Sequence, residues 1–178
     1  MVNCSQFTTG NFKQTKRVAA VLAREILKTK PSKAAILLAL EGDLGSGKTT
    51  FLQGLAKGLG IHEKILSPTF IIFRKFKLRG SKFLPRRQAG KFFYHFDCYR
   101  LKSPKEILEL GFKEIIANPQ NIVAVEWSEK IKTILPKNKI TLKFEFINPV
   151  RDSEDKKKGR RKQISNGVDK NKRQITIK

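Results

Sequence analysis

The spacing of apolar residues near the start of the sequence predicts an amphipathic helix. Val18, Val21, Leu22, Ala23 and Ile26 recur at helical spacing, as residues on one face of a helix do. Asn11 followed by Gln14 fits a capping pattern at the start of this segment, and Pro31 closes it. We therefore expect a surface helix that begins just after Asn11.

Short apolar segments further along the chain predict buried strands. The segment AAILLAL at 34–40 is continuous and lies between Pro31 and Gly42, as in a strand that is buried on both faces of a parallel sheet. Apolar residues then recur at helical spacing from 51 to 59, before a glycine at 60. The segments FFYHF at 92–96 and NIVAVEW at 121–127 are two more strand candidates. The pattern predicts an α/β fold.

A strictly alternating segment predicts a different kind of strand near the C-terminus. Residues 139–147 place Ile140, Leu142, Phe144 and Phe146 on one face and polar residues on the other, which indicates a half-exposed edge strand. Its expected partner is RQITIK at 173–178. The segment FIIFRKFKL at 70–78 is a further strand candidate, and PKEILELGF at 104–112 predicts one or two helical turns.

Length and composition limit the number of sites and the class of protein. A chain of 178 residues with 39% hydrophobic content and 13 Phe is long enough for one domain with a core. The longest apolar run is far too short to cross a bilayer. Two cysteines, Cys4 and Cys98, do not have the spacing of a disulfide framework or a zinc site. We expect one domain over 1–178 in a soluble, unexported, cytoplasmic protein that contacts no membrane.

The charge describes a partner rather than a reaction. Lys and Arg number 38 against 15 Asp and Glu, which gives a net charge of +23. A surplus of this size attracts nucleic acid and acidic surfaces. Two basic stretches are predicted to be mobile excursions: 74–91 contains no acidic residue, and 152–171 contains almost no residues suited to a core. They are either solvated loops or contacts for nucleic acid, and scarce aromatic interleaving favours solvated loops.

The segment between the first predicted strand and the second predicted helix carries the clearest chemistry. Gly42, Gly47, Lys48 and Thr49 satisfy the pattern G-x-x-x-x-G-K-[ST] of a P-loop, in the strand-to-helix context that the motif requires. Glycines let successive backbone N–H groups point into one concavity, and the helix N-terminus adds to its affinity for phosphate. The predicted nucleotide-binding residues here are Gly42, Asp43, Leu44, Gly45, Ser46, Gly47, Lys48, Thr49 and Thr50.

Nucleotide chemistry at this loop also requires a cation and acidic residues. Lys48 is expected to reach the β and γ phosphates, and the Thr49 hydroxyl is expected to bind Mg²⁺. Asp97 and Glu126 stand at the ends of two predicted strands, where α/β folds place their ligands. Either carboxylate could complete the Mg²⁺ shell or orient the attacking water. The alternative is that each is a solvated acid at a strand end.

Four short blocks follow one another along the chain: GDLGSGKTT at 42–50, SPTF at 67–70, HFDCYR at 95–100 and VEW at 125–127. Together they resemble the TsaE family, the small P-loop ATPases of tRNA threonylcarbamoyladenosine biosynthesis. The resemblance implies a three-layer αβα fold with a mostly parallel central sheet and an antiparallel C-terminal edge. It also implies binding of ATP and Mg²⁺, weak intrinsic hydrolysis, and action on the two-subunit threonylcarbamoyl transferase complex that modifies tRNA.

The resemblance also assigns roles to residues at the matching positions. Thr49 and Glu126 would bind the metal, and Asp97 would contact the metal or the water. The segment 67–69 would act as a switch near the γ-phosphate. Asn11 or Thr15 would lie near the adenine, and Lys48, Asp97 and Glu126 form the predicted catalytic set.

Several neighbouring residues keep two interpretations each. Trp127 either packs or stacks on a ligand, with packing favoured. Arg100 either approaches phosphate or pairs with an acid. His95 shares a strand face with Asp97, so it either supports the site or is a hydrogen-bonded structural histidine.

Three rival functions share parts of this pattern. A GTPase would need NKxD, and the segment at 138–141 lacks the final acid. A small-molecule or nucleoside kinase would transfer phosphate to an added substrate rather than to water, with 74–91 as a cationic lid. A basic RNA-binding module would hold nucleotide only as structure, and its RNA binding would survive Lys48→Ala.

Overall fold

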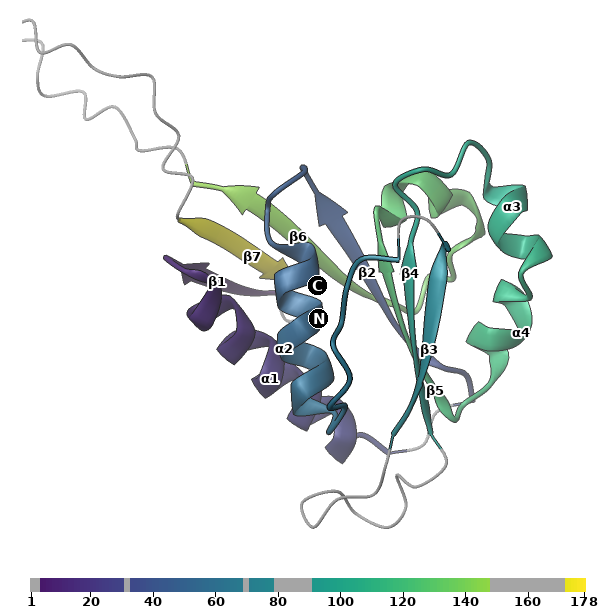
Figure 1. The fold of residues 1–178 in the computed structure, drawn as a ribbon, viewed down its shortest axis with the longest axis horizontal. Helices are drawn as coiled ribbons and strands as arrows, with labels where there is room; N and C mark the ends of the chain where they lie inside the picture. The colour runs from purple at the N-terminus through teal and green to yellow at the C-terminus, as the bar shows by residue number, and fades with distance from the viewer. Residues whose placement is uncertain (1–3, 31–32, 69–70, 79–90, 148–171) are drawn as a thin grey trace, which may run out of the picture.

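A seven-stranded sheet runs through the centre of the computed structural model of the chain (Figure 1). The structure describes residues 4–30, 33–68, 71–78, 91–147 and 172–178. The order of strands in the sheet is β1-β7-β6-β2-β5-β4-β3. The strands are β1 (Ser5–Thr9), β2 (Ile36–Gly42), β3 (Phe73–Lys77), β4 (Phe92–Asp97), β5 (Asn121–Glu126), β6 (Ile140–Phe146) and β7 (Arg173–Ile177).

The centre of this sheet is parallel and both of its margins are antiparallel. Strands β6, β2, β5 and β4 pair in parallel, whereas β3 pairs antiparallel with β4, and β7 pairs antiparallel with β6 and β1. The α/β prediction with a parallel centre and an antiparallel C-terminal margin is therefore confirmed. The central strands are buried on both faces, which explains why their sequences are continuously apolar.

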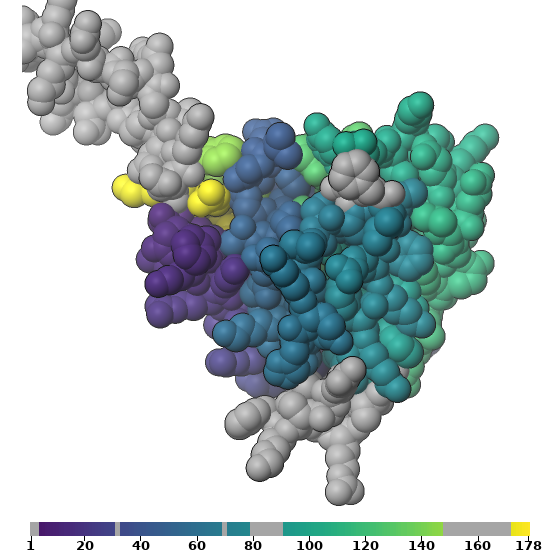
Figure 2. Space-filling model, in the orientation of Figure 1, coloured from purple at the N-terminus to yellow at the C-terminus, as the bar shows by residue number. Residues whose placement is uncertain are grey.

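Helices cover the two faces of the sheet and complete three layers. Helices α1 (Phe12–Lys28) and α2 (Lys48–Gly58) pack on one face, where their apolar side chains share a core with Phe93 and Leu142. On the other face, α3 (Pro104–Glu109), α4 (Phe112–Ala117) and the 3₁₀ helix η2 (Ser128–Ile134) enclose a second core around Phe96. In the space-filling view, the blue residues of α2 lie beside the purple residues of α1 (Figure 2).

Local signals at the helix starts agree with the structure. The Asn11 side chain accepts a hydrogen bond from the backbone N–H of Gln14 at 3.0 Å, so the predicted cap of α1 is confirmed. The Gln14 side chain accepts in turn from the N–H of Gly10. Ser103 and Glu106 form a capping box at α3, which satisfies backbone donors that the first helical turn leaves unpaired. Helix α4 was not predicted.

The prediction of an edge strand at 139–147 is wrong. Strand β6 lies inside the sheet, between β2 and β7. Its alternation has another cause: Leu142 and Phe144 are buried under the layer of α1 and α2, while Lys143 and Glu145 form an exposed ion pair on the opposite side. The polar positions therefore mark an uncovered face of the strand rather than an open edge.

Two further differences concern the ends of the sheet. Strand β1 was not predicted, although it pairs with β7 over its whole length. Strand β3 includes residues 74–77, so the start of the predicted basic excursion at 74–91 belongs to the sheet, paired with β4. The stretches 79–90 and 152–171 lie outside the described residues.

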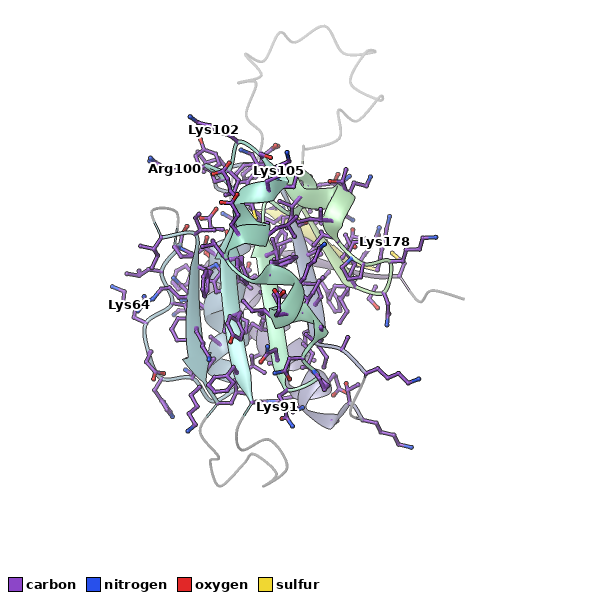
Figure 3. The ribbon with its side chains drawn as sticks, turned by 90° about the vertical axis from the view of Figure 1, so that its right-hand side faces the viewer. Lys64, Lys91, Arg100, Lys102, Lys105 and Lys178 are labelled. Carbon is purple, nitrogen blue, oxygen red and sulfur yellow. The ribbon has the colours of Figure 1, made fainter. Side chains whose placement is uncertain are left out.

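Surface cations occur on several sides of the molecule. Figure 3 labels Lys64, Lys91, Arg100, Lys102, Lys105 and Lys178, which come from separate parts of the chain and point away from the sheet. Arg100, Lys102 and Lys105 gather near the start of α3. In the part of the chain that the structure describes, no helix combines the length and the apolar character needed to cross a membrane.

Candidate functional site

The loop between β2 and α2 has the backbone shape that the glycine pattern predicts. Gly47 adopts a left-handed conformation with φ of 102° directly before the first residue of α2. Gly42 has φ of 133°, and a Cβ atom at this position would lie 2.3 Å from the Phe144 carbonyl oxygen. A side chain at Gly42 would therefore clash with β6. The loop directs the N-terminus of α2 toward a cavity, which favours an anionic ligand there.

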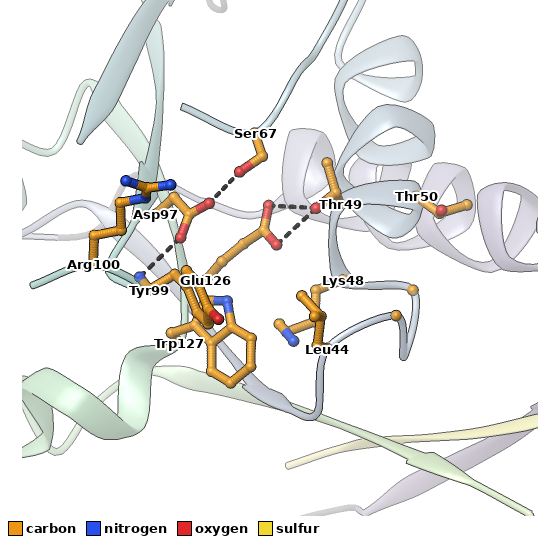
Figure 4. Close-up of a pocket in the computed structure, with 12 residues that line it drawn as sticks. Leu44, Lys48, Thr49, Thr50, Ser67, Asp97, Tyr99, Arg100, Glu126 and Trp127 are labelled. Atoms are coloured by element: carbon orange, nitrogen blue, oxygen red, sulfur yellow. Dashed lines mark hydrogen bonds between the residues drawn. The ribbon is translucent and has the colours of Figure 1, made fainter. Parts of the chain in front are cut away.

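The cavity at this helix N-terminus has a volume of about 510 Å³ (Figure 4). Its lining combines the loop with the ends of β4 and β5 and with the segment before β3. The lining residues are Leu44, Gly45, Gly47, Lys48, Thr49, Thr50, Ser67, Asp97, Tyr99, Arg100, Glu126 and Trp127. All three predicted catalytic residues, Lys48, Asp97 and Glu126, thus line one cavity.

The two carboxylates are brought together by the register of the sheet. Asp97 and Glu126 are the last residues of β4 and β5, and they are paired with each other in the parallel ladder. Both side chains are almost completely buried, with 4% and 2% of their surface exposed. A buried carboxylate requires hydrogen-bond partners, and each of these two has them.

Glu126 is hydrogen-bonded to Thr49, the residue that follows Lys48. The Thr49 hydroxyl donates to the Glu126 carboxylate, at 2.8 Å from Oε2 and 3.0 Å from Oε1. On its other side, Glu126 Oε1 lies 2.8 Å from Nε2 of His95. The contact between Thr49 and Glu126 joins the phosphate loop to the end of the central strand β5.

Asp97 is fixed by two donors from opposite sides. The backbone N–H of Tyr99 donates to Oδ1 at 2.9 Å, and the Ser67 hydroxyl donates to Oδ2. Ser67 belongs to the predicted switch segment 67–69, of which residue 69 lies outside the described part of the chain. The structure therefore links the start of that segment directly to a predicted catalytic acid.

Lys48 is folded back onto its own loop. Its Nζ donates to the carbonyl oxygens of Gly42 at 2.6 Å and Asp43 at 2.8 Å, and it lies 3.9 Å from the centre of the Trp127 ring. Burial lowers the pKa of Lys48, and the negative field of Glu126 opposes that effect. The ammonium group is therefore held by neutral oxygens and by an aromatic face.

Trp127 both packs and faces the cavity. Its ring lies 5.0 Å from that of Tyr99, centre to centre, and its backbone is in the left-handed region with φ of 58°. Such a conformation is unfavourable for a residue with a side chain and occurs often at functional sites. Arg100 is exposed, and it lines the cavity on the side of Asp97 (Figure 4).

A second hollow of about 170 Å³ adjoins the other side of the phosphate loop. It is lined by Gly10, Asn11, Phe12, Thr15, Gly47, Thr50 and Arg173. Asn11 and Thr15, the predicted adenine-side residues, therefore lie next to the loop. Thr15 is buried, its hydroxyl forms a hydrogen bond of 3.0 Å with the Thr9 hydroxyl, and the Asn11 side-chain oxygen caps α1 by accepting from the Gln14 N–H.

Like Gly10 and Phe12, Arg173 is a lining residue that sequence reasoning missed. It comes from β7, at the far end of the sequence, and its side chain approaches the backbone of Gly47 closely: a Cβ added at Gly47 would lie 3.3 Å from Arg173 Cδ and Nε. The contact depends on the long-range pairing of β7 with β1 and β6. No local motif surrounds this arginine.

The oxygen atoms in the main cavity fit a magnesium ion. Thr49 and Glu126 present a hydroxyl and a carboxylate within 2.8 Å of each other, with Asp97 on the next strand. Mg²⁺ prefers such oxygen ligands, and proteins usually bind it through one or two carboxylates together with substrate phosphates and waters. Among the residues that the structure describes, no three His, Cys, Asp or Glu side chains gather to hold a metal by themselves.

Comparisons with known proteins identify the family to which the sequence is similar. The family model described as "Threonylcarbamoyl adenosine biosynthesis protein TsaE" matches residues 9–155. The chain is 35% identical over 130 residues to the tRNA threonylcarbamoyladenosine biosynthesis protein TsaE of Haemophilus influenzae, covering 73% of this chain and 75% of that protein. For the protein of the same name from Rickettsia felis, the identity is 38% over 139 residues, covering 78% and 71%.

A solved structure resembles the whole described fold. A crystal structure of Bacillus subtilis YdiB superimposes with a TM-score of 0.66 at 27% identity, covering 99% of this chain and 86% of that one. The sequence, the three-layer fold and the family match therefore agree over most of the chain. This chain belongs to the TsaE family of threonylcarbamoyl adenosine biosynthesis proteins.

Proposed function

We propose that the chain binds ATP with Mg²⁺ in the main cavity, hydrolyses it slowly, and thereby supports the threonylcarbamoyladenosine modification of tRNA. The observation that carries this proposal is the contact between Thr49 and Glu126 at 2.8 Å, in the same cavity as Lys48 and Asp97. A phosphate loop, a hydroxyl, a lysine and two carboxylates are the parts that phosphoryl transfer to water requires.

The phosphate-binding part is supplied by the loop and by Lys48. The backbone N–H groups at the start of α2 would hold the phosphate oxygens. Lys48 would leave the carbonyl oxygens of Gly42 and Asp43, which now accept its hydrogen bonds, and donate to the β and γ phosphates instead. Since phosphate oxygens carry charge and the two carbonyls do not, this exchange favours the bound state.

The metal-binding part is Thr49 with Glu126, and Asp97 provides the acceptor for water. Bound Mg²⁺ would neutralise charge on the phosphate oxygens. Asp97 would accept a hydrogen bond from the attacking water and orient its oxygen toward the γ-phosphorus. The donors Tyr99 N–H and Ser67 hydroxyl hold the Asp97 carboxylate in place for this task.

The nucleoside is proposed to occupy the second hollow. This hollow shares Gly47 and Thr50 with the phosphate loop, so a ligand whose phosphates lie in the main cavity can extend into it. Asn11, Thr15 and Arg173 line this side. The ribose and adenine would then lie between the start of α1 and β7.

The proposed partner is the two-subunit threonylcarbamoyl transferase complex. Support comes from the family and from exposed apolar side chains near the cavity. Leu44 is 73% exposed in the phosphate loop, and Leu66 and Ile71, which flank the switch segment, are 49% and 61% exposed. A partner that covers these side chains would contact the segment that responds to the γ-phosphate.

A direct test uses the purified protein with Mg²⁺ and ATP. We expect calorimetric heat on titration and slow release of phosphate into water. Phosphate transfer to an added nucleoside or small molecule would instead favour a kinase. Absence of heat and of protease protection at saturating Mg·ATP would contradict the proposal. Adding the purified transferase subunits then tests nucleotide-dependent complex formation, ATPase stimulation and repeated tRNA modification.

A tRNA contact through the basic stretches is a separate proposal with its own test. A variant with Arg86, Arg87 and Lys91 neutralised should bind tRNA more weakly and with a smaller salt dependence. Unchanged affinity and unchanged salt dependence would exclude this role. The same tRNA-binding measurement on Lys48→Ala addresses the rival RNA-binding module. In such a module the nucleotide is only structural, so its tRNA affinity would not change with Lys48→Ala or with ATP.

A further inference from the structure

His95 is a buried polar residue on an apolar face of the sheet. It alternates with Phe93 and Asp97 along β4, so these three side chains point toward the layer of α1 and α2. Phe93 belongs to the core on that side, and His95 itself is 0% exposed. Placing an imidazole in such a position is unfavourable unless its nitrogen atoms find partners.

Only one nitrogen of His95 has a hydrogen-bond partner in the part of the chain that the structure describes. Nε2 lies 2.8 Å from Glu126 Oε1, while the buried Nδ1 has no such partner there. Because a carboxylate accepts, Nε2 must carry the proton that faces it. A histidine retained for stability would be expected to satisfy both nitrogens. The His95 side chain instead makes one hydrogen bond, to Oε1 of the site residue Glu126.

The two oxygens of Glu126 are bound differently. Oε1 accepts a hydrogen bond from His95 Nε2–H and lies 3.0 Å from the Thr49 hydroxyl oxygen. Oε2 lies 2.8 Å from the same hydroxyl oxygen. Thr49 has one proton to donate. The Thr49 hydroxyl can bind a cation through its oxygen and keep this proton, so His95 is the second side-chain donor to Glu126 among these contacts, and it holds Oε1.

We propose that His95 is a positioning residue for Glu126. By holding Oε1, it directs Oε2 toward Thr49, where the two oxygens can bind one Mg²⁺. This inference rests on the proposed Mg·ATP function, and it assigns to His95 no contact with the nucleotide. Hydrogen bonds that orient a ligating carboxylate typically change metal affinity or activity about 10- to 100-fold when removed.

The test compares two amides that differ in where the donor lies. In His95→Gln the amide N–H₂ can reach the position of Nε2, while in His95→Asn it reaches only that of Nδ1. Both variants bury a polar amide in the same place, so a merely structural role predicts similar defects in the two. The positioning role predicts that Gln retains function and that Asn loses it. His95→Leu adds an apolar variant without a donor.

Two readouts separate positioning from folding. The first is calorimetric affinity for a non-hydrolysable ATP analogue, with and without Mg²⁺; the second is the Mg²⁺ concentration for half-maximal hydrolysis. We expect His95→Asn and His95→Leu to lose about 10- to 100-fold of the Mg²⁺ enhancement, with metal-free binding unchanged. His95→Gln should stay within a few-fold of the unmodified protein. Thermal unfolding, monitored by circular dichroism, establishes that each variant is folded.

The outcomes also distinguish this inference from the proposed function. If the unmodified protein shows no Mg²⁺-dependent ATP binding, the proposed function fails. If it binds and hydrolyses Mg·ATP while folded Asn and Leu variants keep the same Mg²⁺ dependence, only the role of His95 is wrong. Equal losses in the Gln and Asn variants would likewise overturn it.

Discussion

The Lys48 ammonium lies 3.9 Å from the centre of the Trp127 ring. The attraction between a cation and an aromatic face depends on this proximity, and Lys48 must move if it is to reach a phosphate. Trp127 is the single tryptophan of the chain. All tryptophan emission therefore comes from the ring that lies beside Lys48.

We predict that binding of Mg·ATP changes the fluorescence of Trp127. Transfer of the Lys48 ammonium from the ring and the loop carbonyls to phosphate removes a charge from beside the indole. A fluorescence titration should follow the same binding curve as calorimetry, and adenosine without phosphates should leave the emission unchanged. Calorimetric binding with constant emission would show that Lys48 stays against the ring.

Replacing Lys48 by alanine should weaken ATP binding. A hydrogen bond to a charged group contributes about 1.5–3 kcal/mol, so the affinity should fall roughly 10- to 150-fold. Lys57→Ala is the matched control because it removes the same charge from the exposed end of the same helix. Calorimetry measures both variants. Equal losses would indicate that overall charge, rather than the loop geometry, determines the affinity.

Asp97→Asn should slow hydrolysis and leave ATP affinity nearly unchanged. The amide oxygen can still accept from the Tyr99 N–H, but it is a weaker acceptor for the attacking water. Groups that act on a proton of the nucleophile contribute about 10²–10⁴-fold to rate. Single-turnover phosphate release and equilibrium binding separate the two effects. A variant with full turnover would remove Asp97 from the catalytic set.

Gly42→Ala should destabilise the fold more than Gly45→Ala does. Both glycines have positive φ, which alone costs alanine about 1–2 kcal/mol. A Cβ at Gly42 would also meet the Phe144 carbonyl at 2.3 Å, whereas one at Gly45 would meet nothing within 4 Å. Urea unfolding measures the difference. Equal stabilities would show that β6 can move away from the loop.

The two cysteines should react at very different rates. Cys4 is exposed and Cys98 is buried, and burial, followed by the field of Asp97, raises the pKa of the Cys98 thiol from 9.0 to about 12. At pH 8 a disulfide reagent should therefore modify Cys4 quickly and Cys98 only after unfolding. Cys4→Ser isolates the slow reaction. Fast modification of Cys98 in that variant would show that the core around this thiol opens readily.

The same thiol contributes to the dependence of stability on pH. Because the folded pKa of Cys98 lies above the unfolded value, the folded state holds the proton more tightly. This contribution to the free energy of unfolding is fully present below about pH 9. It is lost as the pH rises toward 12, and Cys98→Ala should remove this part of the alkaline decline.

Local patterns were sufficient where the determining residues are near one another in sequence. The cap of α1 at Asn11 and the phosphate loop from Gly42 to Thr49 each depend on a few successive positions, and both have the predicted form. The strands β2 and β5 were predicted because burial on both faces makes their sequences continuously apolar.

The remaining features depend on pairing between distant segments. Strand β1 is mostly exposed along its length, so its sequence carries little sign of the partner β7. The contact of His95 with Glu126 exists because β4 and β5 pair in one particular register. Alternation in β6 could not distinguish an uncovered face from an open edge, since both expose every second side chain.

The position of β7 between β1 and β6 affects the order in which the sheet can form during synthesis on the ribosome. Strand β1 cannot take its place in the sheet until residues 173–177, which form β7, have been made. Arg173, beside the phosphate loop, arrives with that same strand. A nascent chain could thus complete its parallel centre early, yet the hollow beside the phosphate loop would be finished only when β7 has paired with β1 and β6.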